Sequence, residues 1–189
     1  MSSNPVIDAA RKTFETNKHW ADLAISQVTD DKLRQRLHQE TNSIIVVMKH
    51  VSGNLQSRWT NFLTEDGEKE WRNRDDEFID TFGSREEGVT YWEKGWDCLF
   101  QSLQQLKDAD LGRTVTIRGE EHSVPLALQR SLGHTCYHVG QIILMSRMSC
   151  GPEWEVLTIP RGQSGDYNSR VWGAESYKSI AQNTDSENQ

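Results

Sequence analysis

The sequence lacks any apolar run long enough to cross a membrane. Its longest apolar runs, Ile44–Met48 and Ile142–Met145, fall far short of the roughly 20 residues that a bilayer-spanning helix needs. The first residues, MSSNPVIDAARK, contain no apolar stretch of the kind found in secretory signals. We therefore expect a cytoplasmic protein with no membrane partner.

Cysteine, excess basic charge and nucleotide-binding motifs are also scarce or missing. The three cysteines form no C-x-x-C pair, which argues against a disulfide framework and suits a reducing compartment. With 28 acidic and 21 basic residues, a net charge of −7 and no Lys/Arg cluster, nucleic acid is not an expected partner. The sequence has no G-x-S-x-G, P-loop or G-x-G-x-x-G motif, so three large enzyme classes are excluded.

What the sequence does contain is helical periodicity in four segments, with no long stretch that alternates with period two. The 189 residues suffice for one domain. We predict an all-α four-helix bundle over 1–180, followed by a disordered tail at 181–189. Apolar residues at helical spacing run through residues 7–28, 31–63, 89–106 and 128–143, with Ser84 as a helix cap and Pro125 in the first turn of the last helix.

The sequence also predicts the structure of the segments between and after the helices. The charged stretch Thr64–Gly83 is predicted to be an ordered loop, because Trp71 and Phe78 need burial. Thr114–Ile117 and Glu121–Val124 flank a turn with glycine and predict a short hairpin. After Gly151 the periodicity ends, which predicts an irregular tail. The sequence has seven tryptophans, and Trp92 and Trp96 follow the apolar stripe that predicts a core position. Aromatic side chains that the core of one chain does not bury favour a homodimer with a two-fold interface.

Two histidines on the last predicted helix form the main candidate for chemistry. His134 and His138, in GHTCYHVGQ, are spaced i, i+4 and project from one helix face, so both rings can reach one metal ion. Their structural alternative is two packed histidines on a half-apolar helix. Cys136 lies on the opposite side and is predicted to be a buried packing thiol. Tyr137 and Gln141 border the pair and are either hydrogen-bond donors to a metal-bound water or surface residues.

A third ligand has to come from another segment, and His50 is the best candidate. Its helix lane is mostly polar, which alone indicates a surface histidine, but the apolar run Ile44–Met48 indicates a stretch covered on several sides. We expect the other three histidines to be solvated: His19, His38 and His122.

Several charged residues allow both a functional and a structural interpretation. Four arginines are candidates to clamp an anionic substrate or to form surface ion pairs: Arg58, Arg72, Arg74 and Arg161. The acidic run Asp75, Asp76 and Glu77 is a candidate general base, or a solvated face.

Longer sequence blocks resemble a known superfamily. The histidine in MKHVSGNLQSRWTNFLTEDGEKEWRNRDDEF and the later blocks YWEKGWDCLF, TIRGEEHSVPLAL, GHTCYHVGQ and LTIPRG resemble an uncharacterised bacterial branch of the DinB/YfiT-like superfamily, over most of the chain to about Asn168. The resemblance implies a four-helix bundle, often a homodimer. It also implies a divalent metal held by three histidines, which by motif are His50, His134 and His138.

The same resemblance suggests functions, because characterised members are thiol-dependent S-transferases and an isomerase. The leading hypothesis is a metal-dependent enzyme, a thiol S-transferase or a hydrolase, with a low-molecular-weight thiol or a small electrophile as partner. Zinc is the first choice of metal, with nickel, iron and manganese also suited to imidazole. The alternatives are a metal- or ligand-binding bundle without turnover and a purely structural dimer.

Overall fold

The computed structural model describes residues 4–173, which are mostly helical. The chain divides into two compact units, residues 1–153 and 154–189. Within residues 154–173, the described part of the second unit, the chain forms the helix α6 (Ser164–Trp172), although the loss of periodicity after Gly151 predicted an irregular tail. The predicted disorder of residues 181–189 lies outside the described residues. Among the described residues, no helix is both long enough and apolar enough to cross a membrane.

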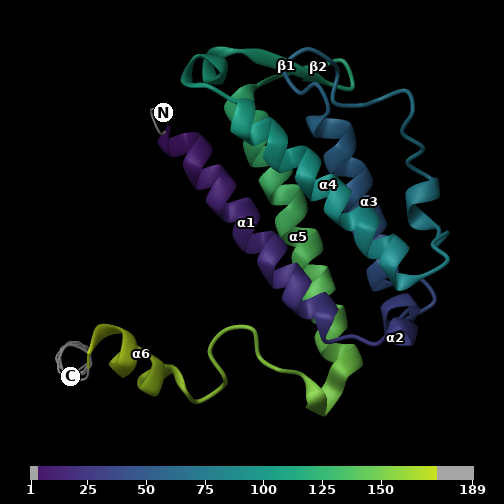
Figure 1. Cartoon of the computed structure of the whole chain (residues 1–189), viewed down its shortest axis with the longest axis vertical. Helices are drawn as coiled ribbons and strands as arrows, with labels where there is room; N and C mark the ends of the chain where they lie inside the picture. Colours follow the sequence, from purple (N-terminus) through teal and green to yellow (C-terminus); the bar gives the residue numbers. More distant parts are fainter. Residues whose placement is uncertain (1–3, 174–189) are drawn as a thin grey trace. The chain divides into compact units, whose positions relative to one another are not determined.

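The first unit is built on four long helices that lie side by side (Figure 1). Three begin where a polar side chain accepts hydrogen bonds from free N–H groups of the first turn: Asn4, Ser84 and Ser123. The Ser84 cap and the position of Pro125 in a first turn are confirmed. The four helices are α1 (Pro5–Ser26), α3 (Ile44–Trp59), α4 (Arg85–Gln105) and α5 (Val124–Cys150).

Each long helix packs against two others, since α3 and α1 each contact both α4 and α5. Phe14 lies edge-on to Trp59 and to Trp96, with ring centroids 6.2 and 6.4 Å apart. Trp92 and Trp96, predicted as core residues, are fully buried. The aromatic core therefore lies where α1, α3 and α4 meet.

The predicted second helix, 31–63, is wrong in its length. The structure has the short helix α2 (Asp30–Arg34), irregular residues 35–43 and then α3. The interrupting residues are polar apart from Leu37, which is itself exposed. Helices in proteins depend on burying an apolar face, and this stretch has none to bury.

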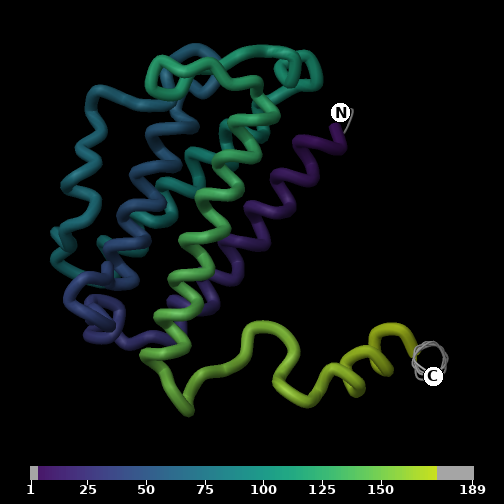
Figure 2. Tube along the Cα trace, turned by 180° about the vertical axis from the view of Figure 1, so that it is seen from behind, coloured from purple at the N-terminus to yellow at the C-terminus, as the bar shows by residue number. Residues whose placement is uncertain are grey.

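The predicted hairpin is confirmed, with its second strand one residue earlier than expected. Strands β1 (Thr114–Ile117) and β2 (Glu120–Ser123) pair antiparallel. Positive φ angles at Arg118 and Gly119 give the tight two-residue turn that matches strand twist. The hairpin lies across one end of the long helices in both views (Figures 1 and 2).

The charged segment 64–83 is ordered, but polar contacts rather than aromatic burial hold it. Trp71 is 58% exposed and Phe78 is half-buried, so the predicted burial is wrong for Trp71. The Asp66 carboxylate instead accepts hydrogen bonds of 2.8 Å from the backbone N–H groups of Arg118 and Gly119. Despite partial burial, these bonds hold the pKa of Asp66 at about 2. Two 3₁₀ turns flank α4, η1 (Asp76–Phe78) and η2 (Asp108–Gly112), and η3 (Gly151–Glu153) follows α5.

Candidate metal centre

His50 lies on α3, a helix that is buried in the interior of the first unit. Every residue of this helix except Arg58 is buried, and His50 itself is only 6% exposed. The polar lane that indicated a surface position therefore faces other protein groups. Of the two interpretations left open by the sequence, the structure selects the covered setting.

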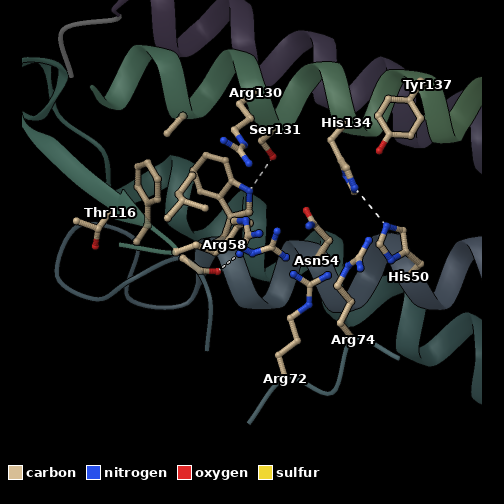
Figure 3. A pocket seen from close by; sticks show the side chains of 16 residues that line it. His50, Asn54, Arg58, Arg72, Arg74, Thr116, Arg130, Ser131, His134 and Tyr137 are labelled. Carbon is tan, nitrogen blue, oxygen red and sulfur yellow. Dashed lines mark hydrogen bonds between the residues drawn. The ribbon is translucent and has the colours of Figure 1, made fainter. Parts of the chain in front are cut away.

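Helix α5 brings His134 and His138 to the same point. His50 Nε2 lies 3.3 Å from His134 Nε2. The ring centroids of the three histidines are 4.7–5.3 Å apart, and one nitrogen from each ring lies within 4.8 Å of the other two. Figure 3 shows the His134 side chain extending from α5 towards His50 on α3.

Contacts outside the cluster determine which nitrogen is free in two of the rings, His50 and His138, whereas His134 Nδ1 is buried without a hydrogen-bond partner. His50 Nδ1 lies 2.9 Å from Glu77 Oε2, and His138 Nδ1 lies 2.8 Å from Gln141 Oε1. Since a carboxylate and an amide oxygen accept hydrogen bonds, both Nδ1 atoms donate and both Nε2 atoms keep their lone pairs. His138 Nε2 is buried with no hydrogen-bond partner, which is unusual for a buried polar atom.

Burial also keeps two of the rings uncharged. It lowers the pKa of His134 to about 3, with further lowering by His138 and His50. Burial likewise lowers the pKa of His138 to about 4, partly opposed by the hydrogen bond with Gln141. Both imidazoles are therefore neutral at pH 7, which is the form that ligates metals.

Glu77 is held against His50 by a network of buried groups. The guanidinium of Arg72 donates to both Glu77 oxygens at 2.8 and 2.9 Å. Burial opposes ionisation of Glu77, but hydrogen bonds from His50 and Arg72 lower its pKa. Gly53 leaves the room that the carboxylate occupies, since a Cβ at Gly53 would lie 2.8 Å from Glu77 Cδ. Lys49 fixes the same turn by donating to the carbonyl oxygens of Asp76 and Ile79.

This burial corrects the expectation for the acidic run. Asp75 and Asp76 are exposed, as a solvated face would be, but Glu77 is 4% exposed. The sequence offered one weak signal for Glu77, the glycine at position 53 one turn after His50, because a buried helical glycine often marks a close approach.

A cavity of about 170 Å³ adjoins the cluster between α3 and α5, with His50 and His134 in its wall (Figure 3). Three of the four arginines named from the sequence line it: Arg58, Arg72 and Arg74. Arg161 belongs to the second unit and is exposed. Among the polar lining residues, sequence reasoning missed five: Asn54, Thr116, Arg118, Arg130 and Ser131. For Arg130 the signal was present, because it lies one turn before His134 on α5.

Two other expectations around the histidines are wrong. Cys136 is exposed and accepts a hydrogen bond from Asn17 Nδ2 at 3.2 Å, because the buried stripe of α5 passes through Thr135 instead. His122 is buried, with Nδ1 2.9 Å from the Glu120 carbonyl oxygen and Nε2 3.0 Å from Arg130 Nη1.

The remaining expectations about polar residues have mixed outcomes. His19 and His38 are exposed, as expected. Tyr137 is more than half exposed, with its ring edge-on to His134 at 5.3 Å. Gln141 contacts His138 directly.

Comparison with known proteins gives a family but no function. The model of a family described as "Protein of unknown function (DUF1572)" matches residues 2–163. No curated protein matches the chain, and no solved structure matches it. The geometry of the site is therefore the main evidence for what the protein does.

Proposed function

The chain belongs to the DUF1572 family of proteins of unknown function, and because that description assigns no activity, we propose from the site that the protein binds one divalent metal ion. The ligands are the Nε2 atoms of His50, His134 and His138. The observation that carries the proposal is the convergence of three histidine nitrogens within 4.8 Å, two of them on rings whose Nδ1 atoms are already hydrogen-bonded.

The spacing of the donor atoms fits this proposal. Two ligands of a tetrahedral zinc, each 2.0–2.1 Å from the ion, lie about 3.3–3.4 Å apart. His50 Nε2 and His134 Nε2 are 3.3 Å apart. Without an ion, two uncharged rings would share one hydrogen bond, and the buried His138 Nε2 would still lack a partner.

The groups behind the ligands also fit. Metal-bound histidines commonly donate their second N–H to a carboxylate or an amide oxygen, which fixes the ring and raises its basicity. Glu77 takes this position for His50 and Gln141 takes it for His138. Arg72 in turn holds Glu77. The chain therefore supplies an oriented set of ligands on two rigid helices.

The four long helices and the three histidine positions support the finer assignment to a DinB/YfiT-like four-helix bundle. Zinc is the first choice of metal, with nickel, iron or manganese as alternatives, because imidazole binds all four. A dication with three protein ligands has an open position and lowers the pKa of a bound water or thiol. This chemistry supports a metal-dependent enzyme, a thiol S-transferase or a hydrolase.

The second candidate is a bundle that binds a metal or small ligand without turnover. The observation that favours it is the absence, among residues 4–173, of a further buried acid or base that lines the cavity beside the histidines. We also propose that the protein is a homodimer, supported by exposed apolar side chains such as Leu144 and Met148 on α5. Light scattering that shows a single species of 21.7 kDa would contradict the dimer.

Titration of the metal-free protein with zinc, followed by calorimetry, tests the proposal. We expect one ion per chain and loss of most of the binding in His50→Ala, His134→Ala and His138→Ala. The matched control is His19→Ala, an exposed histidine on α1 that should bind zinc as the wild type does. Turnover of an electrophile in the presence of a low-molecular-weight thiol then separates the enzyme from the binding protein.

A further inference from the structure

Five arginines line the cavity beside the histidine cluster, in a chain whose net charge is −7. They come from separate parts of the fold. Arg58 lies on α3, Arg130 on α5 and Arg118 in the hairpin turn, while Arg72 and Arg74 lie in the segment 64–83. In Figure 3 the side chains of Arg72 and Arg74 reach into the cavity from one side and that of Arg130 from the other. Positive charge is therefore concentrated here against the overall balance of the protein.

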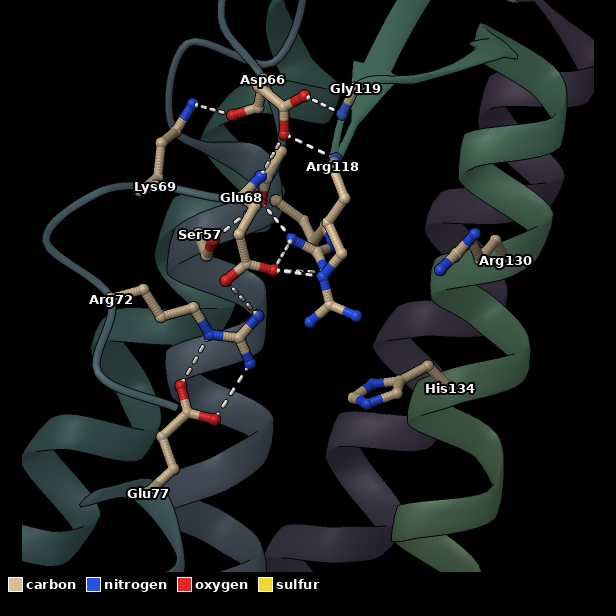
Figure 4. Close-up of polar contacts among 12 residues, drawn as sticks. Ser57, Asp66, Glu68, Lys69, Arg72, Glu77, Arg118, Gly119, Arg130 and His134 are labelled. Atoms are coloured by element: carbon tan, nitrogen blue, oxygen red, sulfur yellow. Dashed lines mark hydrogen bonds and ion pairs between the residues drawn. The ribbon is translucent and has the colours of Figure 1, made fainter. Parts of the chain in front are cut away.

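Two carboxylates neutralise only part of this charge. Glu68 lies 3.2 Å from Arg58 Nη2, 2.8 Å from Arg118 Nε and 3.5 Å from Arg72 Nη1, so one carboxylate serves three guanidiniums (Figure 4). Glu77 is paired with Arg72 as described above. Five guanidiniums against two carboxylates leave an excess of three positive charges.

Arg74 and Arg130 have no carboxylate partner among the described residues. Arg74 lies over the ring of Phe78, 5.6 Å from its centroid. Arg130 Nη1 is 3.0 Å from His122 Nε2, and this imidazole nitrogen is its only hydrogen-bond partner within residues 4–173. Both side chains keep most of the five N–H donors of a guanidinium free for another acceptor.

The inner arginines are removed from water, which makes their repulsion costly. The side chains of Arg72 and Arg58 are 2% and 11% exposed. Burial and then the neighbouring Arg72 lower the pKa of Arg58. Glu68 and Glu77 compensate these two buried charges. The excess positive charge therefore lies on the exposed residues Arg74 and Arg130, where an anion in the cavity would neutralise it.

We propose that this cavity binds a small organic anion through a carboxylate or phosphate group held by Arg74, Arg118 and Arg130. Guanidinium forks match the paired oxygens of these groups, and Arg is the side chain best suited to them. The buried apolar residues Trp59, Phe62 and Ile117 also line the cavity and accept an apolar portion of the ligand. A cavity of about 170 Å³ is smaller than typical drug-sized sites of roughly 300–1,000 Å³, so the ligand is small.

The bound anion is the substrate of the proposed metal site. This role as a substrate rests on the proposed function, but the binding of the anion does not. His134 lies in the wall of the cavity, so an anion bound by the arginines has its other end beside the histidines. Binding of the anion itself requires no metal, because none of the three proposed anchors belongs to the histidine cluster.

Calorimetric titration of the full-length protein with sodium phosphate and with sodium succinate tests the inference at low ionic strength. For the metal-free wild type we expect one molecule of at least one probe per chain, with a dissociation constant below about 1 mM. In the double variant Arg74→Gln/Arg130→Gln, which breaks no ion pair, binding should weaken at least tenfold. The matched control is Arg36→Gln, an exposed arginine outside the cavity, which should bind the probes as the wild type does.

His138→Ala separates this inference from the metal site, because His138 is a proposed ligand but does not line the cavity. We expect this variant to lose zinc and keep the anion affinity of the wild type within about threefold. If the wild type binds zinc but neither probe, the anion site is wrong and the metal site stands. Equal probe affinity in the wild type and the double arginine variant also overturns it. Probe binding without zinc binding overturns the proposed function and leaves the anion site standing.

Discussion

The two sides of helix α3 differ in how they meet their neighbours. Towards α4 the contact is close: Gly95 lies against Ser52 and Gly88 against Ile45, with little space for even a methyl group. Towards α5 the helices enclose a cavity lined by arginine and histidine. The side of α3 towards α4 is thus tightly packed, whereas the side towards α5 carries polar side chains that line a cavity.

We call the side of α3 towards α4 the close side and the side towards α5 the open side. The tight packing of the close side provides stability that the polar, cavity-lined open side lacks. Buried charges and unpartnered imidazole nitrogens destabilise a fold, so a protein that keeps them needs stabilisation elsewhere. The tryptophans of α4 and the glycine contacts supply apolar burial next to the same helix that carries His50. On the open side, Trp59 Nε1 donates to Ser131 Oγ at 3.2 Å and links α3 to α5 across the end of the cavity.

The largest effect on stability is expected from Gly95→Ala, which disturbs the close side. The added Cβ would lie 2.6 Å from Ser52 Cα and 2.5 Å from Ser52 Oγ, so backbone has to move. We expect a loss of about 3 kcal/mol in the free energy of unfolding, measured by urea denaturation.

Gly140→Ala is the matched control for Gly95→Ala. Gly140 also lies inside a long helix, but apart from the surrounding backbone of α5 itself an added methyl meets no atom of residues 4–173 within 4 Å. Its expected effect is a gain of about 0.5–1 kcal/mol, because alanine favours helix over glycine. Equal effects of the two substitutions would show that α3 and α4 do not approach as closely as described.

Glu77→Gln tests whether the carboxylate behind His50 contributes to metal binding on the open side of α3. The amide keeps the size of the side chain but loses the charge that orients His50 and pairs with Arg72. Loss of such an outer partner typically weakens metal binding about 10–100-fold. Zinc titration of this variant beside Asp75→Asn, an exposed neighbour, measures the effect, and equal affinities would contradict a role for Glu77.

The metal-free protein should lose stability as pH falls from 7 to 5. The lowered pKa values of His134 and His138, about 3 and 4, leave both rings neutral in the folded state, whereas the unfolded chain takes up protons near its ordinary pKa of about 6.5. The unfolded state binds more protons in this range, so acid favours unfolding.

We expect a total loss of about 1–2 kcal/mol after allowance for solvent screening, measured by chemical denaturation at several pH values in the presence of a chelator. The lowered pKa values of Asp66 and Glu77 act at more acidic pH and do not contribute here. His134→Gln should flatten the dependence, and a slope unchanged by that substitution would argue against a buried neutral ring.

The smallest effect is expected from Cys136→Ala, on the face of α5 turned away from the cavity. Because the thiol is exposed, the free energy of unfolding should change by less than about 0.5 kcal/mol, with zinc content unaltered. Cys150 is buried, with its Sγ 3.3 Å from the Gln27 carbonyl oxygen, and its replacement by Ala should cost about 1 kcal/mol. The reverse order would mean that the faces of α5 are misassigned.

The sequence predicted the parts of this molecule that depend on local pattern. Helical spacing, the Ser84 cap and the hairpin turn at Gly119 are encoded by neighbours in the chain, and so is the shared face of His134 and His138. His50 was the best candidate for the third ligand from the residues alone, but its polar lane and the apolar run Ile44–Met48 left its burial open. The superfamily resemblance then placed it with the other two histidines.

The remaining features depend on contacts between distant segments. Glu77 belongs to an acidic run that looks solvated, and only the fold places it over Gly53 and beside His50. Arg118 and Arg130 join the cavity because the hairpin and α5 meet the segment 64–83 there. The interruption at residues 35–43 was missed because a helix ends where burial ends, and burial is a tertiary property.

The most direct test of the central claim is the anomalous diffraction of a zinc-soaked crystal, measured above and below the zinc absorption edge. We predict one strong peak in the first unit, about 2.0–2.1 Å from Nε2 of each of His50, His134 and His138. A crystal soaked under the same conditions that shows no peak at the three rings, or a peak that only one of them reaches, would contradict the account.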